Sequence, residues 1–305
     1  MTTAIGASGL LVVKLGGRTQ QDPALPAAIA SAWSARGGAL VVVHGGGDEA
    51  SALMRAMGRQ PVFVDGRRVT AAEDIDILRM ALSGSANKRL VSALVAAGVR
   101  ALGLSGEDGA LLAAETTEEL APLGMVGKVV AVDARALHGL VHAGWLPVLS
   151  PVSADRARPG QALNVNGDDA AAMVAAALGA DELLLVSDVP AVLAPGESGA
   201  LAPLGTIHPE KARELVASGV AAGGMAAKLG AALDALAHGV VRVRVSDVAA
   251  IADATRGTVI TGTPTGATVE RTSRPASPTP TSTPRVPGDH SIGRMKYDAW
   301  AASRS

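Results

Sequence analysis

Between residues 10 and 262, short runs of aliphatic and β-branched residues alternate with longer stretches of helix-forming residues. The short runs predict strands at residues 10–15, 39–44, 99–104, 146–150, 182–187 and 240–245. The longer stretches predict helices at residues 23–36, 48–57, 72–97, 133–143, 167–178, 209–218 and 225–238. Strands that alternate with helices are typical of βαβ units, so the pattern predicts an α/β fold with a mostly parallel sheet.

The alternating pattern ends near residue 264, where the composition changes. Six of the 17 prolines lie in residues 264–305, mixed with Ser, Thr and Arg, and apolar residues become sparse. Such a segment cannot bury enough apolar surface to offset the entropy lost on ordering, so we predict a disordered tail. Because six basic and three acidic residues give it a net charge of +3, the net charge of −1 for the chain conceals a more acidic body.

Composition excludes several classes of protein. Without Cys there is no disulfide framework, iron–sulfur cluster, thiolate zinc site or Cys nucleophile. Only 2% of the residues are aromatic and the pI is about 6.6, so we expect no nucleic-acid partner. Apolar runs fall far short of the roughly 20 residues that span a bilayer, and no basic region precedes the first one. We therefore expect no membrane partner and a cytoplasmic location.

Two glycine-rich segments follow the first two predicted strands. In α/β sheets, ligands bind at the carboxyl ends of the strands. Lys14 closes the first strand and is followed by Gly16 and Gly17, and a lysine at a buried strand end is costly unless it meets an anion. The second strand leads through Gly45 and Gly46 into a helix, and such backbone N–H groups at a helix N-terminus form an anion site.

Polar residues also occupy the later junctions. Arg68 lies in a predicted turn, and arginine is suited to bidentate binding of a carboxylate. Asn164 and Asp168 precede or begin an Ala-rich helix, where one such residue is an ordinary N-cap. We place Lys228 in the first turn of a helix, where it opposes the helix dipole unless an anion is near. His138 and His142 have no acidic third ligand nearby, so we predict no metal ligands from the protein.

Nine segments, in order, carry a resemblance to a known family. They are VVKLGG, VVVHGGG, DGRRVT, SGSANKRLV, LGLSGEDG, GWLPVLSPV, NVNGDDAA, SDVPAVL and GGMAAKLGAAL. Together they resemble the amino acid kinase family, and within it the acetylglutamate kinase branch. This resemblance implies a three-layer sandwich with a central, mostly parallel eight-stranded sheet. It also implies an N-terminal lobe for the acyl-amino acid at residues 1–178 and a C-terminal lobe for the nucleotide at residues 179–263. Residues 255–262 resemble the last strand region of the family.

The activity implied by the resemblance is transfer of the γ-phosphoryl group of ATP to the γ-carboxylate of N-acetyl-L-glutamate in arginine biosynthesis. Mg²⁺ would be held mainly by phosphates and water. N-Acetylaminoadipate, one methylene longer, stays open as the substrate, because a methylene discriminates by only about 1–3 kcal/mol. A non-catalytic subunit that binds a nucleotide or an amino acid is the alternative of another class, and the retained Lys14, Asp168 and Lys228 argue against it.

The same resemblance assigns roles to individual residues. Lys14 and Lys228 match the two lysines that stabilise the transferring phosphoryl group, and Asp168 matches the aspartate that organises them. The acyl-amino acid would be bound by Gly45, Gly46, Arg68 and Asn164. The nucleotide would be bound by Gly16, Asp188, Val189, Pro190, Ala191, Val192, Leu193, Val220, Ala221 and Ala222.

Three features bear on the finer predictions. Gly167 stands where the family usually has Ala, and Ala191 stands where it usually has Gly. Only about nine residues precede the first predicted strand, whereas the arginine-inhibited hexamers of the family carry an extra N-terminal helix. The resemblance therefore implies a homodimer that arginine does not inhibit.

Overall fold

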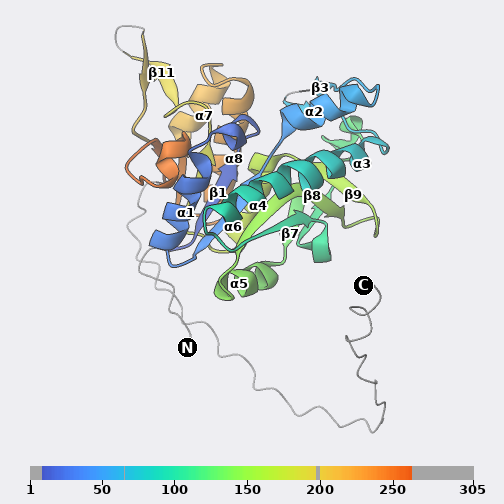
Figure 1. The fold of residues 1–305 in the computed structure, drawn as a ribbon. Helices are drawn as coiled ribbons and strands as arrows, with labels where there is room; N and C mark the ends of the chain where they lie inside the picture. The colour runs from blue at the N-terminus through green and yellow to red at the C-terminus, as the bar shows by residue number, and fades with distance from the viewer. Residues whose placement is uncertain (1–8, 65, 197–199, 263–305) are drawn as a thin grey trace, which may run out of the picture. The chain divides into compact units, whose positions relative to one another are not determined.

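One mixed sheet runs through the part of the chain that the structure describes. The computed structural model describes residues 9–64, 66–196 and 200–262 (Figure 1). Its eleven-stranded sheet consists of β1 (Leu11–Leu15), β2 (Leu40–His44), β5 (Ala101–Gly106), β6 (Leu112–Glu115), β7 (Val126–Val132), β8 (Leu146–Asp155), β9 (Ala162–Val165), β10 (Glu182–Val186), β13 (Thr206–Ile207), β14 (Arg242–Ser246) and β15 (Thr258–Ile260). Two hairpins stand apart from it: β3 (Phe63–Val64) with β4 (Arg67–Arg68), and β11 (Leu193–Pro195) with β12 (Leu201–Pro203).

Helices follow most of the central strands, as the pattern predicts. They are α1 (Leu25–Ala35), α2 (Gly47–Ala56), α3 (Asp74–Leu78), α4 (Asn87–Ala96), α5 (Ala134–His142), α6 (Gly167–Ala177), α7 (Pro209–Ala217) and α8 (Gly223–Ala237). A π-helical segment, Arg79–Ala86, joins α3 to α4, so the single helix predicted at residues 72–97 contains a wider turn. Among the described helices, none is long and apolar enough to cross a membrane.

The sheet is parallel at its centre and mixed at its edges. β1 lies between β10 and β2 and is parallel to both, and β2 continues in parallel to β8. The pairs β6–β7, β8–β9 and β14–β15 are antiparallel. Eight strands are therefore not confirmed. The sequence pattern misses β6, β9 and β13, which have two to four residues, too few to show a hydrophobic period. It also misses the seven-residue β7, and it underestimates β8, which runs on to Asp155.

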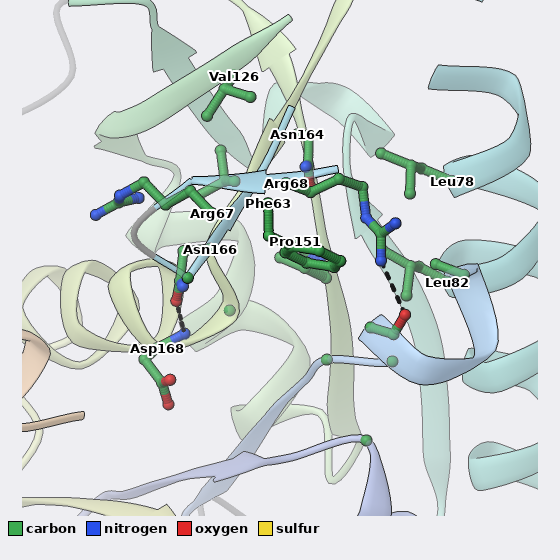
Figure 2. A pocket seen from close by; sticks show the side chains of 18 of the residues that line it. Phe63, Arg67, Arg68, Leu78, Leu82, Val126, Pro151, Asn164, Asn166 and Asp168 are labelled. Carbon is green, nitrogen blue, oxygen red and sulfur yellow. Dashed lines mark hydrogen bonds between the residues drawn. The ribbon is translucent and has the colours of Figure 1, made fainter. Parts of the chain in front are cut away.

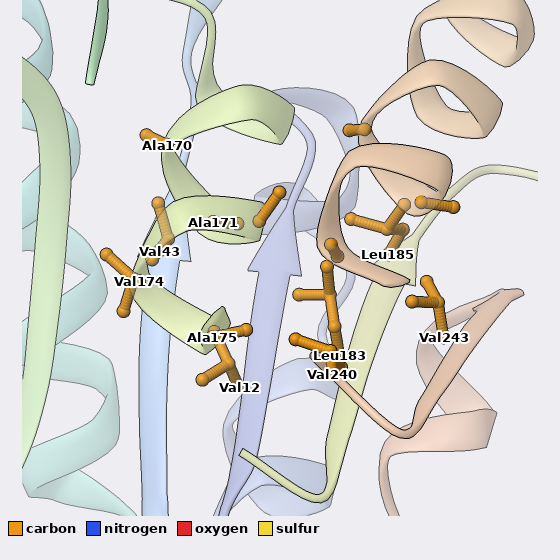
Figure 3. Close-up of a cluster of buried hydrophobic side chains, with 14 of the residues drawn as sticks. Val12, Val43, Ala170, Ala171, Val174, Ala175, Leu183, Leu185, Val240 and Val243 are labelled. Atoms are coloured by element: carbon orange, nitrogen blue, oxygen red, sulfur yellow. The ribbon is translucent and has the colours of Figure 1, made fainter. Parts of the chain in front are cut away.

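Alternate residues of the central strands supply two separate cores. Val12, Val43 and Leu183 face a cluster that includes residues of α6 and α8 (Figure 3). Leu11 and Val13 face the opposite cluster, to which α1 and α4 contribute. Because successive strand side chains point to opposite faces, one apolar run fills both cores. The result is the three-layer arrangement that the sequence predicts.

The lobe boundary predicted at residue 178 lies within a continuous structure. The described residues, from 9 to 262, form one compact unit, and β1 of the N-terminal part pairs with β10 of the C-terminal part. The division into an acyl-amino-acid lobe and a nucleotide lobe stays a prediction. The predicted tail, residues 264–305, lies outside the described residues.

A buried ion network holds the amino ends of β10 and β14 together. Both Nε and Nη2 of Arg244 contact Glu182 Oε1, at 2.8 and 2.7 Å, and Arg242 Nη2 lies 2.8 Å from Oε2. Arg244 also donates to the carbonyl oxygens of Asp253 and Arg256. Arg244 is 1% exposed and Glu182 is 6% exposed, so their ion pair is shielded from water, whereas the Arg242 side chain is 35% exposed.

We expect Arg244→Met to lower the free energy of unfolding by about 3–5 kcal/mol, because Glu182 would lose most of its compensation. Urea unfolding measures the change. Arg213→Met is the matched control, because Arg213 is an exposed residue of α7 whose ion-pair partner is Glu210. A loss below about 1 kcal/mol, as for a surface pair, would contradict a structural role for the network.

Candidate active site

The register of the sheet gathers the predicted site at one edge. Lys14 lies opposite Val43 of β2 and Leu185 of β10, so the three strands end together. Two cavities open at these ends, with volumes of about 200 and 230 Å³. Gly17 and Gly47 line both, so the cavities adjoin. Figure 2 shows the first cavity. We call the first the acceptor cavity and the second the phosphate cavity.

Three predicted catalytic residues meet where the two cavities adjoin. Lys14 Nζ lies 2.8 Å from Asp168 Oδ1, and Lys228 Nζ lies 3.4 Å from both carboxylate oxygens. Lys14 and Asp168 line the acceptor cavity, and Lys228 lines the phosphate cavity. All three are buried: Lys14 is 6% exposed, Asp168 5% and Lys228 9%. A pair of lysines therefore shares a single buried carboxylate.

The start of α6 fixes that carboxylate. Asn166 is the N-cap, and its side chain accepts a hydrogen bond from the Asp168 N–H at 2.8 Å (Figure 2). Asp168 thus lies in the first helical turn, where the helix dipole favours a negative charge. Gly167 lies beside it, and a Cβ there would come 3.3 Å from Lys14 Cε. The alanine usual in the family would need a small shift of Lys14.

The charges of the cluster alter its pKa values. Burial alone would raise the pKa of Asp168, but the charges and hydrogen bonds of Lys14 and Lys228 outweigh it and hold the pKa below its usual range. Burial lowers the pKa of Lys228, and the charge of Lys14 lowers it further, against the opposing effect of Asp168. Asp168 is therefore the group that limits the fall in the pKa of Lys228.

Lys228 lies in the second turn of α8 and not in the first, which corrects the prediction. α8 begins at Gly223, two residues before the predicted start at Met225. The apolar pattern does not mark this start, because the first helical residues are two glycines. Lys228 is 9% exposed, and the anion close to it is the side chain of Asp168.

Arg68 enters the acceptor cavity from the β3–β4 hairpin and is 7% exposed. Its Nη2 donates to the carbonyl oxygen of Gly47 at 2.8 Å (Figure 2). The same nitrogen donates to Ser51 Oγ at 2.7 Å. Its Cζ lies 4.6 Å from the centre of the Phe63 ring, a cation–π contact. These contacts hold the Arg68 cation inside the cavity, whereas an arginine in a solvated turn would be exposed to water.

Asn164, Gly45 and Gly46 complete the predicted acceptor side. Asn164 lies on β9 and donates to Thr70 Oγ1 at 3.0 Å. The N–H of Gly45 donates to the carbonyl of Leu15 at 2.9 Å, so it is used within the protein. Gly46 is the N-cap of α2, and a Cβ there would come 2.7 Å from Leu82 Cδ2. All of the predicted acceptor residues line one cavity.

The predicted nucleotide residues are only partly gathered. Gly16 and Asp188 line the phosphate cavity together with Lys228. The other predicted nucleotide residues are not among the described residues that line this cavity. Val192 and Ala221 lie in the same buried cluster, and Ala191 is also buried. Val189 and Leu193 are half-buried, whereas Pro190, Val220 and Ala222 are exposed.

Several residues of the acceptor cavity escape prediction from the sequence. The structure adds Phe63, Arg67, Leu78, Leu82, Val126, Pro151 and Asn166 to its lining. In the sequence, Leu78 and Leu82 have the spacing of ordinary core residues of a helix. We recognise no sequence signal for the π-helical segment Arg79–Ala86, which contains Leu82. Only Arg67 and Asn166 are polar neighbours of predicted residues, so proximity in sequence could have suggested them.

His44 lies beneath the acceptor cavity and is 0% exposed. Its Nδ1 is 2.8 Å from the Gly45 carbonyl, which makes this nitrogen the donor, and its Nε2 accepts from Asn87 Nδ2 at 3.0 Å. Burial lowers the pKa of His44 to about 4. The imidazole is therefore neutral at neutral pH.

This shift predicts acid destabilisation. Between its ordinary pKa of 6.5 and about 4, His44 binds a proton in the unfolded chain and not in the native one. Stability therefore falls as the pH falls through this window, by about 3 kcal/mol in total. Urea unfolding at several pH values measures this loss. His44→Gln, in which the group does not titrate, should show a shallower slope from pH 6.5 to pH 4. An equal slope in both proteins would contradict the assignment.

Comparison with known proteins bears on this site. The sequence profile of the amino acid kinase family matches residues 9–247. The chain belongs to the amino acid kinase family. Within the family, acetylglutamate kinase of Chloroflexus aurantiacus is 44% identical over 243 residues, which are 79% of this chain and 93% of that protein. Acetylglutamate kinase of Synechocystis sp. is 40% identical over 247 residues, 79% and 81% of the two chains.

Solved structures confirm the α/β fold of the family. The structure of smu.665 from Streptococcus mutans is 28% identical, with a TM-score of 0.72, and the match covers 83% of this chain and 99% of that one. Carbamate kinase from Giardia lamblia shares the fold at 15% identity, with a TM-score of 0.63 and coverage of 84% and 99%. The profile match and the relatives at 40–44% identity confirm the family inferred from the nine segments.

Proposed function

We propose that this chain transfers the γ-phosphoryl group of ATP to the γ-carboxylate of N-acetyl-L-glutamate, which yields an acyl phosphate. The observation that carries the proposal is the pair of lysines, one from each adjoining cavity, on the shared carboxylate of Asp168. The relatives named acetylglutamate kinase support this choice within the family. The product would be an intermediate of arginine biosynthesis.

The chemistry requires charge stabilisation and no general base. A carboxylate with an ordinary pKa near 4.3 is already ionised at neutral pH, so it can attack the phosphoryl group directly. The obstacle is repulsion between two anions and the charge on the phosphoryl oxygens. Lys14 would neutralise this charge from the acceptor side and Lys228 from the phosphate side. Asp168 would act by positioning the two ammonium groups.

The acceptor cavity offers complementary groups for an acylated amino acid. Arg68 presents a buried cation suited to the α-carboxylate, and Asn164 presents an amide for the acyl-amino acid. The Gly45 N–H already donates to the Leu15 carbonyl, so we assign the amide contact with the reacting group to the Gly46 N–H. We assign to Gly45 a close approach of its backbone to the substrate. Apolar residues such as Leu78 and Leu82 close the other side of the cavity.

The phosphates of ATP would lie in the cavity lined by Gly16, Asp188 and Lys228. We assign the adenosine to the segments from Asp188 to Leu193 and from Val220 to Ala222. Within the described residues, no group of three or more acidic or histidine side chains could hold a metal ion. Mg²⁺ would be held mainly by the phosphates and water, where it would neutralise their charge, because it usually keeps several of its waters when it binds substrate phosphates.

Kinetics with two substrates test the proposal. Formation of acyl phosphate, trapped as the hydroxamate, is measured with N-acetylglutamate and with N-acetylaminoadipate. We expect a higher kcat/KM for N-acetylglutamate. A preference for the longer substrate would assign the chain to N-acetylaminoadipate, and no product with either, from folded protein, would favour a non-catalytic binding subunit.

The assembly and the location of the protein are also proposed. We propose a homodimer that arginine does not inhibit, in the cytoplasm. Light scattering would reveal the molar mass, and a hexamer would overturn the assignment. An assay with added arginine would separately overturn the lack of inhibition if activity fell.

A further inference from the structure

The carbonyl oxygen of Gly45 accepts hydrogen bonds from two side chains. Gln20 Nε2 donates at 2.7 Å and His44 Nδ1 at 2.8 Å. Gln20 lies in the 3₁₀ turn Arg18–Gln21, which follows β1, and its Nε2 also lies 3.4 Å from the Gly16 carbonyl. One amide side chain thus links the glycine segments that follow β1 and β2.

These two bonds fix the direction of the next peptide N–H. A trans peptide group is planar and its C=O and N–H point in opposite directions. The described chain has no cis peptide bond, so the Gly46 N–H points away from the side on which Gln20 and His44 lie. Gly45 and Gly46 line the acceptor cavity, whereas neither Gln20 nor His44 belongs to its lining.

The way in which Gln20 is held supports a positioning role. Its Oε1 is buried with no hydrogen-bond partner among the described residues, so the side chain is held through its Nε2 donor alone. An unpaired buried acceptor costs free energy. His44 is fixed from its other side by Asn87, which also donates to the carbonyl of Val148 at 2.9 Å. His44 is therefore anchored by Asn87, whereas Gln20 is held through the contacts of its Nε2 with the Gly16 and Gly45 carbonyl oxygens.

We propose that Gln20 and His44 are positioning residues that aim the Gly46 N–H at the transferring phosphoryl group. The proposal rests on the phosphoryl transfer proposed above. A preorganised N–H aimed at developing charge stabilises the transition state more than the bound substrate. Removal of a donor from the Gly45 carbonyl lets this peptide group rotate, so it lowers kcat while substrate binding through Arg68 and Asn164 persists.

Gln20→Met tests the proposal, because methionine has nearly the same length and cannot donate to Gly45. We expect kcat to fall about tenfold and both KM values to change less than about threefold, the pattern of an interaction made only in the transition state. Gln21→Met is the matched control, since Gln21 is the exposed next residue of the same turn, and it retains the wild-type kcat. Thermal unfolding of both variants reports any change in stability.

Gln20→Glu keeps the shape of the side chain and replaces the donor by an acceptor. Gln20→Glu therefore lowers kcat at least as much as Gln20→Met. If Gln20→Met proves unstable, the kcat of Gln20→Glu tests the positioning role in its place. A wild-type kcat in the folded Glu variant, or an equal loss in Gln21→Met, overturns the positioning role. Absence of acyl phosphate with the wild-type protein is a separate result, which overturns the proposed function itself.

Discussion

Lys228→Ala is expected to lower kcat by about 10²–10³-fold, with less than about a threefold change in the KM for N-acetylglutamate. Lys228 lines the phosphate cavity, 3.4 Å from Asp168, and has no contact with Arg68 or Asn164, which we assign to the substrate. Its ammonium group would stabilise charge that develops on the phosphoryl oxygens during transfer. Its loss therefore raises the barrier while the acceptor substrate still binds.

Steady-state kinetics with both substrates varied measure this effect. Lys211→Ala serves as the control, because Lys211 is an exposed residue of α7 that pairs with Glu214. It should leave kcat unchanged. An unaltered rate in Lys228→Ala, or a loss confined to the KM for N-acetylglutamate, would refute the assigned role of Lys228.

Asp168→Asn is the second substitution with a large expected effect. The amide keeps the shape of the side chain but leaves Lys14 and Lys228 without their shared negative charge. The two cations then repel each other in a buried site, and we expect kcat to fall about 10²-fold. The pKa of Lys228, already below its usual range, should fall further, because Asp168 is the group that raises it.

A pH profile distinguishes this mechanism from simple loss of structure. Activity that requires protonated Lys228 falls as the pH rises through its pKa, so the alkaline limb of kcat/KM should move to lower pH in Asp168→Asn. Asp169→Asn is the neighbouring control, because Asp169 pairs with Arg67 at 2.8 Å. It should leave the alkaline limb in place. An unshifted limb in Asp168→Asn would show that Asp168 does not control the protonation of Lys228.

The central fold was predictable because its signals are local. Parallel strands buried on both faces appear as apolar runs such as Leu40–His44, and the helices between them have lengths and start residues that the sequence shows. Asp133 and Asn166 cap α5 and α6 through their own side chains. The strands at and next to one edge of the sheet lacked such signals: β13 has two residues and β15 has three, too few for a period to emerge.

The candidate site was predictable in a different way. Gly16, Gly45 and Asp188 were expected because carboxyl ends of neighbouring parallel strands meet at one edge, and the structure places each of them on a cavity there. The resemblance to the family supplied their roles, which no local pattern contains. The start of α8 was misjudged by two residues, since glycines give no helix signal, and this moved Lys228 by a turn.

By itself, the sequence determined the α/β class, the parallel centre of the sheet and the charged groups available for phosphoryl transfer. Only the tertiary structure decided how those groups combine. Asp168 and Lys228 are 60 residues apart, and their 3.4 Å approach depends on the packing of α6 against α8. The same is true of Gln20 and Gly45, which lie 25 residues apart. Periodicity reports which face of an element is buried, but it contains no information about which buried polar groups will share a partner.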